Sequence, residues 1–198
     1  RVFCYANAEI RKADQKDEIL RFVHFWKDRT GQWPKELIFD SKLTTYANLN
    51  ALNGLGIRFI TLKRRSPNEL DAIRREPRSA WRRVELKGVS RLYKTPRILD
   101  RRIPLRDYQG PIRQLSILDL GHEEPTLLLT NQLTHSPAPL IQRYAQRMLI
   151  ENNIQDGIDF FHMDALSSAV AMKVNCDLQL TLMASSLYRL LAQQIGQG

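Results

Sequence analysis

The chain has 198 residues, of which 43% are hydrophobic, and a formal net charge of +9 at pH 7. This length and composition allow a buried core in one or two domains. The two cysteines, Cys4 and Cys176, match neither a disulfide framework nor a zinc-binding spacing, so we expect a protein of a reducing cytosol.

The first third of the chain alternates between strand-like and helix-like patterns. Residues 2–9 have a strand composition, and residues 14–29 carry apolar side chains at helical spacing. A short apolar run at 36–39, a helical pattern from 46 onward and an apolar run at 57–62 follow. This alternation predicts an α/β fold.

Asp40 follows directly on the apolar run at 36–39. The carboxyl end of a buried strand is where α/β sheets place ligand-binding and catalytic groups, so Asp40 is a candidate site residue. Helix capping is the alternative role for Asp40. Ser41, Thr44 and Thr45 could provide the cap instead.

The middle of the chain is basic and predicted to be rich in strands. Residues 58–106 contain 16 Lys and Arg against 5 Asp and Glu, whereas the rest of the chain contains 14 against 16. Such a concentration of positive charge indicates a protein that neutralises nucleic-acid phosphates, and a solvated basic face without a partner is the alternative. After a helix at 67–76, the pattern predicts strands at 81–86, 90–93, 112–118 and 126–130.

Trp81 lies among arginines, next to Arg82 and Arg83 and near Arg78. It is a candidate for stacking on an unpaired base. Packing in the core is the alternative, and the role that we favour.

Residues 139–153 have a helical pattern that brings Tyr144, Arg147 and Glu151 into one line. Residues three and four apart on a helix are neighbours, so the pattern predicts that Arg147 reaches Glu151. A surface ion pair is the simple alternative. Residues 165–195 are apolar but interrupted by Lys173, Asn175 and Asp177, which predicts a buried pair of helices and not a membrane span.

The spacing Tyr144, Arg147, Glu151, together with the strand-ending Asp40, resembles the DDE transposases of bacterial insertion sequences. The resemblance is to the subgroup with a Tyr-Arg-Glu-Lys signature, and it extends to segments 43–49, 60–65 and 160–166. It implies that Asp40 is the second catalytic acid, that Glu151 is the third, and that Tyr144 and Arg147 contact DNA or support the site. The chain departs from the signature at its last position, where Ile158 stands in place of Lys.

The family resemblance also implies an architecture. We expect a ribonuclease-H-like, retroviral-integrase-like core made by residues 1–66, a basic β-rich insertion at 67–135, and a segment at 136–198 with the Glu-bearing helix and C-terminal helices. In this fold the first catalytic Asp lies on a strand before the segment at 2–9. We therefore expect that Asp upstream of Arg1, and expect the chain to be an inactive fragment with two of three acids.

The implied chemistry is phosphodiester hydrolysis and strand transfer in cut-and-paste DNA transposition. Two divalent ions activate the attacking oxygen and neutralise the leaving one, and oxygen ligands suit Mg²⁺, with Mn²⁺ as a substitute. Asp40 and Glu151 are the expected metal ligands. The expected partners are the transposon ends, target DNA and a second copy of the chain in a homodimer, in the cytoplasm at the bacterial nucleoid and without a membrane. The expected DNA contacts are Tyr144, Arg147, Arg64, Arg65, Trp81 and Arg82.

Two other functions remain open. A transposase remnant could keep the basic surface and bind DNA without catalysis. A ribonuclease-H-like nuclease without strand transfer would cut DNA but never join its ends.

Overall fold

A computed structural model describes residues 3–87, 94–121, 123–165 and 168–196. The chain divides into two compact units. One unit is Gln15–Arg147, and the other combines Arg1–Asp14 with Met148–Gly198. The predicted strand at 90–93 lies outside the described residues.

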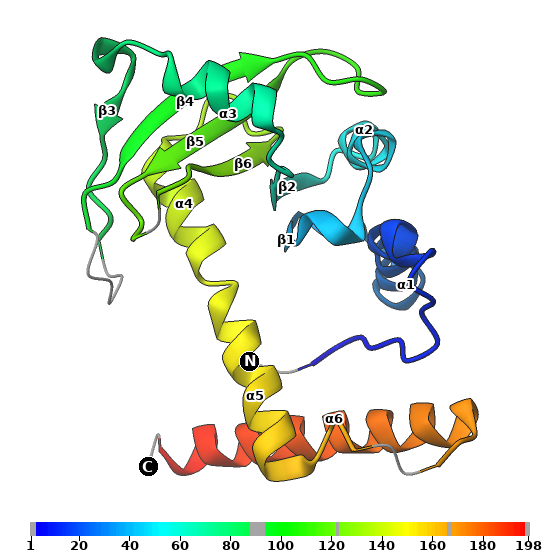
Figure 1. The fold of residues 1–198 in the computed structure, drawn as a ribbon. Coiled ribbons are helices and arrows are strands. Elements are labelled where there is room, and N and C mark those ends of the chain that lie inside the picture. Colours follow the sequence, from blue (N-terminus) through cyan, green and yellow to red (C-terminus); the bar gives the residue numbers. More distant parts are fainter. Residues whose placement is uncertain (1–2, 88–93, 122, 166–167, 197–198) are drawn as a thin grey trace. The chain divides into compact units, whose positions relative to one another are not determined.

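The first unit contains a six-stranded mixed sheet, which confirms an α/β fold (Figure 1). Its strands have the order β1-β2-β6-β5-β4-β3. The pair β1 and β2 is parallel, and each of the other neighbouring pairs is antiparallel. The strands are β1 (Glu36–Phe39), β2 (Arg58–Leu62), β3 (Arg82–Arg83), β4 (Arg97–Ile103), β5 (Ile112–Leu118) and β6 (Thr126–Thr130).

The strands of the predicted insertion at 67–135 therefore continue the same sheet that β1 and β2 begin. The predicted strands at 112–118 and 126–130 are confirmed as β5 and β6. The strand predicted at 81–86 is reduced to β3, although the Val84 and Leu86 N–H groups still donate to the Pro96 and Lys94 carbonyls. Strand β4 was not predicted.

Four helices belong to this unit: α1 (Glu18–Thr30), α2 (Tyr46–Gly54), α3 (Pro67–Arg74) and α4 (Pro137–Ala145). Local sequence explains their ends. Gly31 stops α1 in the left-handed conformation, at φ 72°. Thr45 caps α2 through its side chain, and Pro67 and Pro137 begin α3 and α4, where a missing N–H costs nothing. Three short 3₁₀ turns are η1 (Gln15–Asp17), η2 (Ser41–Leu43) and η3 (Arg78–Ala80).

Helices cover both faces of the sheet (Figure 1). Side chains alternate along each strand, so Phe59 packs with α1 and α2 whereas its neighbour Ile60 packs with α4. Leu99 of β4 packs against Ile73 of α3 in a third cluster. The same alternation along β1 directs Phe39 toward α1 and α2, and the following residue toward α4.

The second unit is made by α5 (Met148–Phe161), α6 (Ala171–Ile195) and an N-terminal segment. The prediction of a strand at 2–9 is wrong for residues 3–9, which form no strand. This segment bonds to α6 instead: the Phe3 N–H donates to Ser186 Oγ at 3.3 Å, and Gln179 Nε2 donates to the Ala6 carbonyl at 3.1 Å. In the described chain no strand pairs with residues 3–9. Their strand-like composition is therefore not sufficient to form a strand without a partner.

Two predictions about the C-terminal third need correction. The continuous helix at 139–153 is wrong, because α4 ends at Ala145 and α5 begins at Met148. The buried helix pair at 165–195 is also wrong: α6 is one helix of 25 residues whose buried residues are Leu182 and Ser185. Among the described residues, every helix is too short or too polar to cross a membrane.

Candidate functional site

Asp40 stands where β1 ends and η2 begins. Its Oδ1 accepts the Lys42 N–H at 3.0 Å and the Ser41 hydroxyl at 3.3 Å, so Asp40 caps η2. Thr45 caps α2 separately, with its Oγ1 accepting the Asn48 N–H at 3.2 Å. The side chain of Asp40 keeps 35% of its surface exposed, which leaves Oδ2 accessible to another group.

Arg147 and Tyr144 meet Asp40 at this edge of the sheet. Arg147 Nη1 lies 4.0 Å from Asp40 Oδ2, at the outer limit of an ion pair. The guanidinium also lies 5.6 Å from the centre of the Tyr144 ring, within the range of a cation–π contact. Arg147 therefore lies near both Asp40, from which more than a hundred residues of chain separate it, and Tyr144, three residues before it.

A polar network next to this group was not predicted from the sequence. Arg143 Nη1 donates to both oxygens of Glu36, at 2.8 and 2.7 Å, and Gln132 Nε2 donates to Glu36 Oε1 at 2.6 Å. Glu36 begins β1 and Arg143 lies in the last turn of α4. The network therefore links the last turn of α4 to the start of β1. The only signal in the sequence was a charged residue at the start of an otherwise apolar strand.

Glu151 lies in the first turn of α5 and is exposed. It belongs to the second unit, whereas Asp40, Tyr144 and Arg147 belong to the first. The helix that was expected to carry Tyr144, Arg147 and Glu151 is interrupted between α4 and α5, and the shared face of the three residues stays a prediction. At the interruption the Arg147 N–H donates to the Tyr144 carbonyl three residues back, a tightening typical of a helix end.

The residues around Asp40 do not by themselves fit a metal ion. Among the described residues, no group of three or more His, Cys, Asp or Glu side chains is arranged to hold a metal. In the first unit, Asp40 is accompanied by a hydroxyl, a backbone N–H and a guanidinium. Mg²⁺ is held by oxygen ligands, and a lone carboxylate facing a cation is a poor set. The predicted ligand pair Asp40 and Glu151 is divided between the two units.

The predicted DNA-contacting residues outside this group lie on separate elements. Arg64 and Arg65 follow β2; both are exposed, and Arg65 Nη1 lies 2.8 Å from Glu124 Oε2. Trp81 is half-buried and packs against the cluster of Ile73, Leu99 and Leu127, which supports the core role. Arg82 is exposed on the edge strand β3 and pairs with Asp100 at 2.6 Å.

The basic segment at 58–106 is partly neutralised by local ion pairs. Asp100 is the most connected acid, because both Arg113 and Arg82 contact it. Burial opposes the ionisation of Asp100, but the hydrogen bond and charge of Arg113, with the charge of Arg82, outweigh it and lower its pKa. Further pairs are Lys63–Glu69, Arg74–Asp71, Arg97–Asp119, Arg101–Glu76 and Arg106–Asp107.

Other cations of the segment are exposed and have no ion pair among the described residues: Arg58, Arg64, Arg75, Arg78, Arg83, Lys87, Lys94 and Arg102. Exposed guanidinium and ammonium groups can exchange their counterions for phosphates. The segment therefore keeps a surface suited to a polyanion.

No model of a known protein family matches this sequence, and comparison with curated proteins finds no match.

Proposed function

We propose that this chain acts in DNA transposition as a transposase of the DDE type, with a ribonuclease-H-like core in which Asp40 and Glu151 are catalytic acids. The observation that carries the proposal is the convergence of Asp40, Tyr144 and Arg147. The resemblance to the transposase signature implies that these residues act in one site, and the contact between Asp40 and Arg147 agrees with it.

Two features of the first unit support the same proposal. Asp40 ends a strand whose parallel neighbour is β2, and the carboxyl end of parallel strands is the usual position of a site in an α/β sheet. The exposed cations after β2 and along the strands supply charge for a polyanionic substrate such as DNA. DNA ends and target DNA as substrates, a homodimer on paired ends, and a location at the bacterial nucleoid are parts of this proposal.

Magnesium, with manganese as a substitute, is also part of the proposal. The single carboxylate of Asp40 does not fit a metal ion alone, so the proposal requires Glu151 to join it. The role that follows for Arg147 needs no metal. Its guanidinium, stacked on Tyr144, can hold a phosphodiester oxygen close to Asp40.

The first test is DNA binding by the 198-residue chain, measured by fluorescence anisotropy with a labelled duplex at several salt concentrations. We expect a dissociation constant of about 10⁻⁶ to 10⁻⁴ M at physiological salt, with the logarithm of affinity falling linearly as salt rises. Arg147→Ala should weaken binding, whereas Arg29→Ala, an exposed cation at the end of α1, should not. An absence of binding at low salt would overturn the proposal.

The alternative of a DNA-binding protein without catalysis is favoured by one observation, the incomplete set of carboxylates around Asp40. Under this alternative, Asp40 would only cap η2. Asp40→Asn separates the two functions, because the amide keeps an acceptor for the Lys42 N–H but loses the charge. Stability and DNA binding should be nearly unchanged in both cases. Metal binding should fall only if the chain is a transposase.

A further inference from the structure

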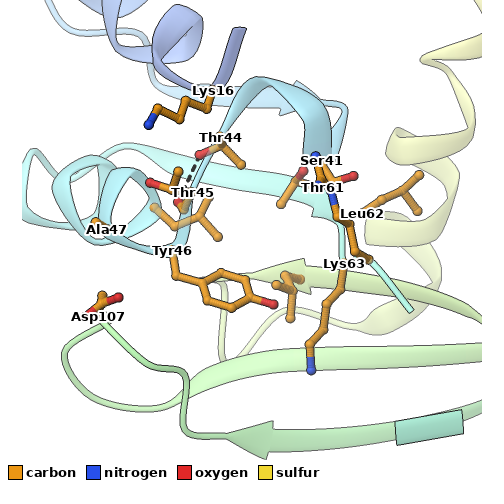
Figure 2. A pocket seen from close by; sticks show the side chains of 13 residues that line it. Lys16, Ser41, Thr44, Thr45, Tyr46, Ala47, Thr61, Leu62, Lys63 and Asp107 are labelled. Atoms are coloured by element: carbon orange, nitrogen blue, oxygen red, sulfur yellow. Dashed lines mark hydrogen bonds between the residues drawn. The ribbon is translucent and has the colours of Figure 1, made fainter. Parts of the chain in front are cut away.

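A pocket lies in the first unit where the parallel strands β1 and β2 end (Figure 2). Ser41, Thr44 and Thr45 line it after β1, and Thr61, Lys63 and Arg64 line it at the end of β2. Its cavity volume is about 430 Å³, within the range of pockets that hold small molecules. The pocket borders the first turn of α2, because Tyr46 and Ala47 also line it.

The pocket lies on the other side of the sheet from Arg147. Thr61 has the same orientation as Phe59, which packs with α1 and α2, because side chains two residues apart on a strand share a face. Asp40 and Arg147 instead meet on the face that α4 covers. The pocket therefore lies on the other face of the sheet from the Asp40–Arg147 pair, although Ser41, which lines it, donates to Asp40.

The polar part of the lining carries positive charge and hydrogen-bond donors. Its cations are Lys16, Lys63 and Arg64, and its one acid is Asp107. Lys63 also donates to Glu69 at 2.6 Å and to Gln114 at 3.0 Å, so its ammonium is held in place. The N-terminus of α2 adds the positive end of a helix dipole.

Tyr46 adds a hydroxyl in the middle of the pocket. Figure 2 shows its ring extending across the pocket in the direction of Lys63. Burial raises the pKa of Tyr46, the charge of Glu69 raises it further, and Arg64 opposes them. Tyr46 therefore stays protonated at neutral pH and can donate a hydrogen bond.

Thr61 is the observation that points to a ligand. Its side chain is fully buried, with a relative exposure of 0%, and it lines the pocket. Its Oγ1 has no hydrogen-bond partner among the described residues. Buried hydroxyl groups nearly always have a partner, because leaving one unpaired costs stability. Valine has almost the same shape and would avoid this cost, so the hydroxyl calls for a partner that enters from the pocket.

We propose that this pocket binds the phosphate group of a nucleotide-sized ligand, with Arg64 and the hydroxyl groups of Thr61 and Tyr46 as donors. A phosphate presents several acceptor oxygens in different directions, which suits donors that arrive from β2, from α2 and from the loop after β2. A carboxylate is planar and would satisfy fewer of them. The phosphate can come from a free nucleotide or from the backbone of DNA.

The test uses the full 198-residue chain and four probes. Inorganic phosphate, thymidine 5′-monophosphate and acetate are titrated by calorimetry, and a labelled DNA duplex is titrated by anisotropy. Thr61→Val removes the buried hydroxyl, and Arg64→Gln removes the exposed cation. Arg29→Gln is the matched control, because Arg29 is also exposed but lies outside the basic segment and does not line the pocket.

We expect inorganic phosphate and the mononucleotide to bind, and acetate not to bind. Thr61→Val and Arg64→Gln should each raise the dissociation constant about tenfold, the loss expected for one hydrogen bond to a charged group, and Arg29→Gln should leave it unchanged. Without ligand, Thr61→Val should unfold at the same temperature as the parent chain or at a higher one, because it removes an unpaired buried hydroxyl.

The probes also distinguish the two sources of the phosphate. If the small phosphates do not bind but duplex binding is weakened by both Thr61→Val and Arg64→Gln, the pocket takes a phosphate of the DNA backbone. If both variants bind every probe as the parent chain does, or if acetate binds as well as phosphate, the proposal is wrong. The transposase proposal is tested separately by changes at Arg147 and Asp40. Arg64 belongs to both proposals, so Thr61→Val, which leaves every exposed charge in place, is the variant that separates them.

Discussion

The ion pair between Glu36 and Arg143 should be a measurable contributor to stability, because it joins the start of β1 to the last turn of α4. Glu36 accepts two hydrogen bonds from Arg143 and one from Gln132, between 2.6 and 2.8 Å long. Hydrogen bonds to charged groups contribute about 1.5–3 kcal/mol each when they are shielded from water. The side chains are 18% exposed for Glu36 and 30% for Arg143, so solvent reduces this value.

We expect Glu36→Gln to lower the free energy of unfolding by about 1–2 kcal/mol, because the amide keeps one acceptor but loses the charge. Arg143→Met keeps most of the aliphatic stem and removes the guanidinium. A double-mutant cycle of these two changes, measured by urea unfolding, should give a coupling energy of about 1–2 kcal/mol.

The matched control is the pair Asp71 and Arg74, three residues apart on α3, whose side chains are 55% and 60% exposed. Its cycle, with Asp71→Asn and Arg74→Met, should give less than about 0.5 kcal/mol, as exposed pairs do. A coupling energy for Glu36 and Arg143 as small as that of the control would refute the claim that this link between α4 and β1 contributes to stability.

Four further outcomes test other charged groups of the chain. Asp100→Asn should lower the free energy of unfolding by about 2–3 kcal/mol, because it leaves the buried Arg113 guanidinium without its anion; urea unfolding measures this. Because the pKa of Asp100 is lowered in the folded state, its ionised carboxylate stabilises the fold above about pH 4. The parent chain should lose this stability as the pH falls through the folded-state pKa. Asp100→Asn has no carboxyl group at this position and should not show this loss. Glu151→Ala should leave the affinity for duplex DNA unchanged within about twofold, because a carboxylate does not neutralise a phosphate; a large loss in anisotropy titrations would contradict its role as a catalytic acid. Replacing Arg64 and Arg65 together by Gln should weaken DNA binding and reduce the slope of log affinity against log salt by about 1–2, and an unchanged slope would exclude both from the DNA surface.

The helices and strands with strong local signals could be predicted from the sequence. The apolar runs that became β1, β2, β5 and β6 are short and bounded by turn residues, and the helix at 67–76 begins with a proline. Strand β4 could not be predicted, because Asp100, Arg101 and Arg102 interrupt its apolar pattern. Its charges are accepted only because Arg113 on β5 and Glu76 after α3 lie next to them in the folded chain.

The segments that were predicted wrongly lack such local signals. Residues 3–9 have a strand composition, but a strand also needs a partner, and the described chain gives them bonds to α6. The interruption between α4 and α5 contains neither Gly nor Pro, so the helical pattern runs through it unmarked. The interruption coincides with the boundary between the two units, which is a property of tertiary packing and not of local propensity.

The candidate site could be predicted in part. The residues Asp40, Tyr144 and Arg147 were singled out by position and spacing, and Arg147 lies near the other two. The network of Glu36, Arg143 and Gln132 that links α4 to β1 was missed, because its members are ordinary polar residues until the fold brings them into contact. The pocket lined by Thr61 was missed for a different reason: a threonine in a strand is common, and only burial without a partner makes this one informative.

The claim that Asp40 and Glu151 belong to one metal site can be tested without DNA or catalysis. Fe²⁺ can replace Mg²⁺ at carboxylate sites, and with ascorbate and peroxide it generates radicals that cut the nearby backbone. The protein fragments are then mapped by mass spectrometry for the parent chain, Asp40→Asn and Glu151→Gln. We expect cuts near both residue 40 and residue 151 in the parent chain, with both sets lost in each variant. Cuts at only one of the two positions, or variants that each lose only their own cuts, would contradict a shared site.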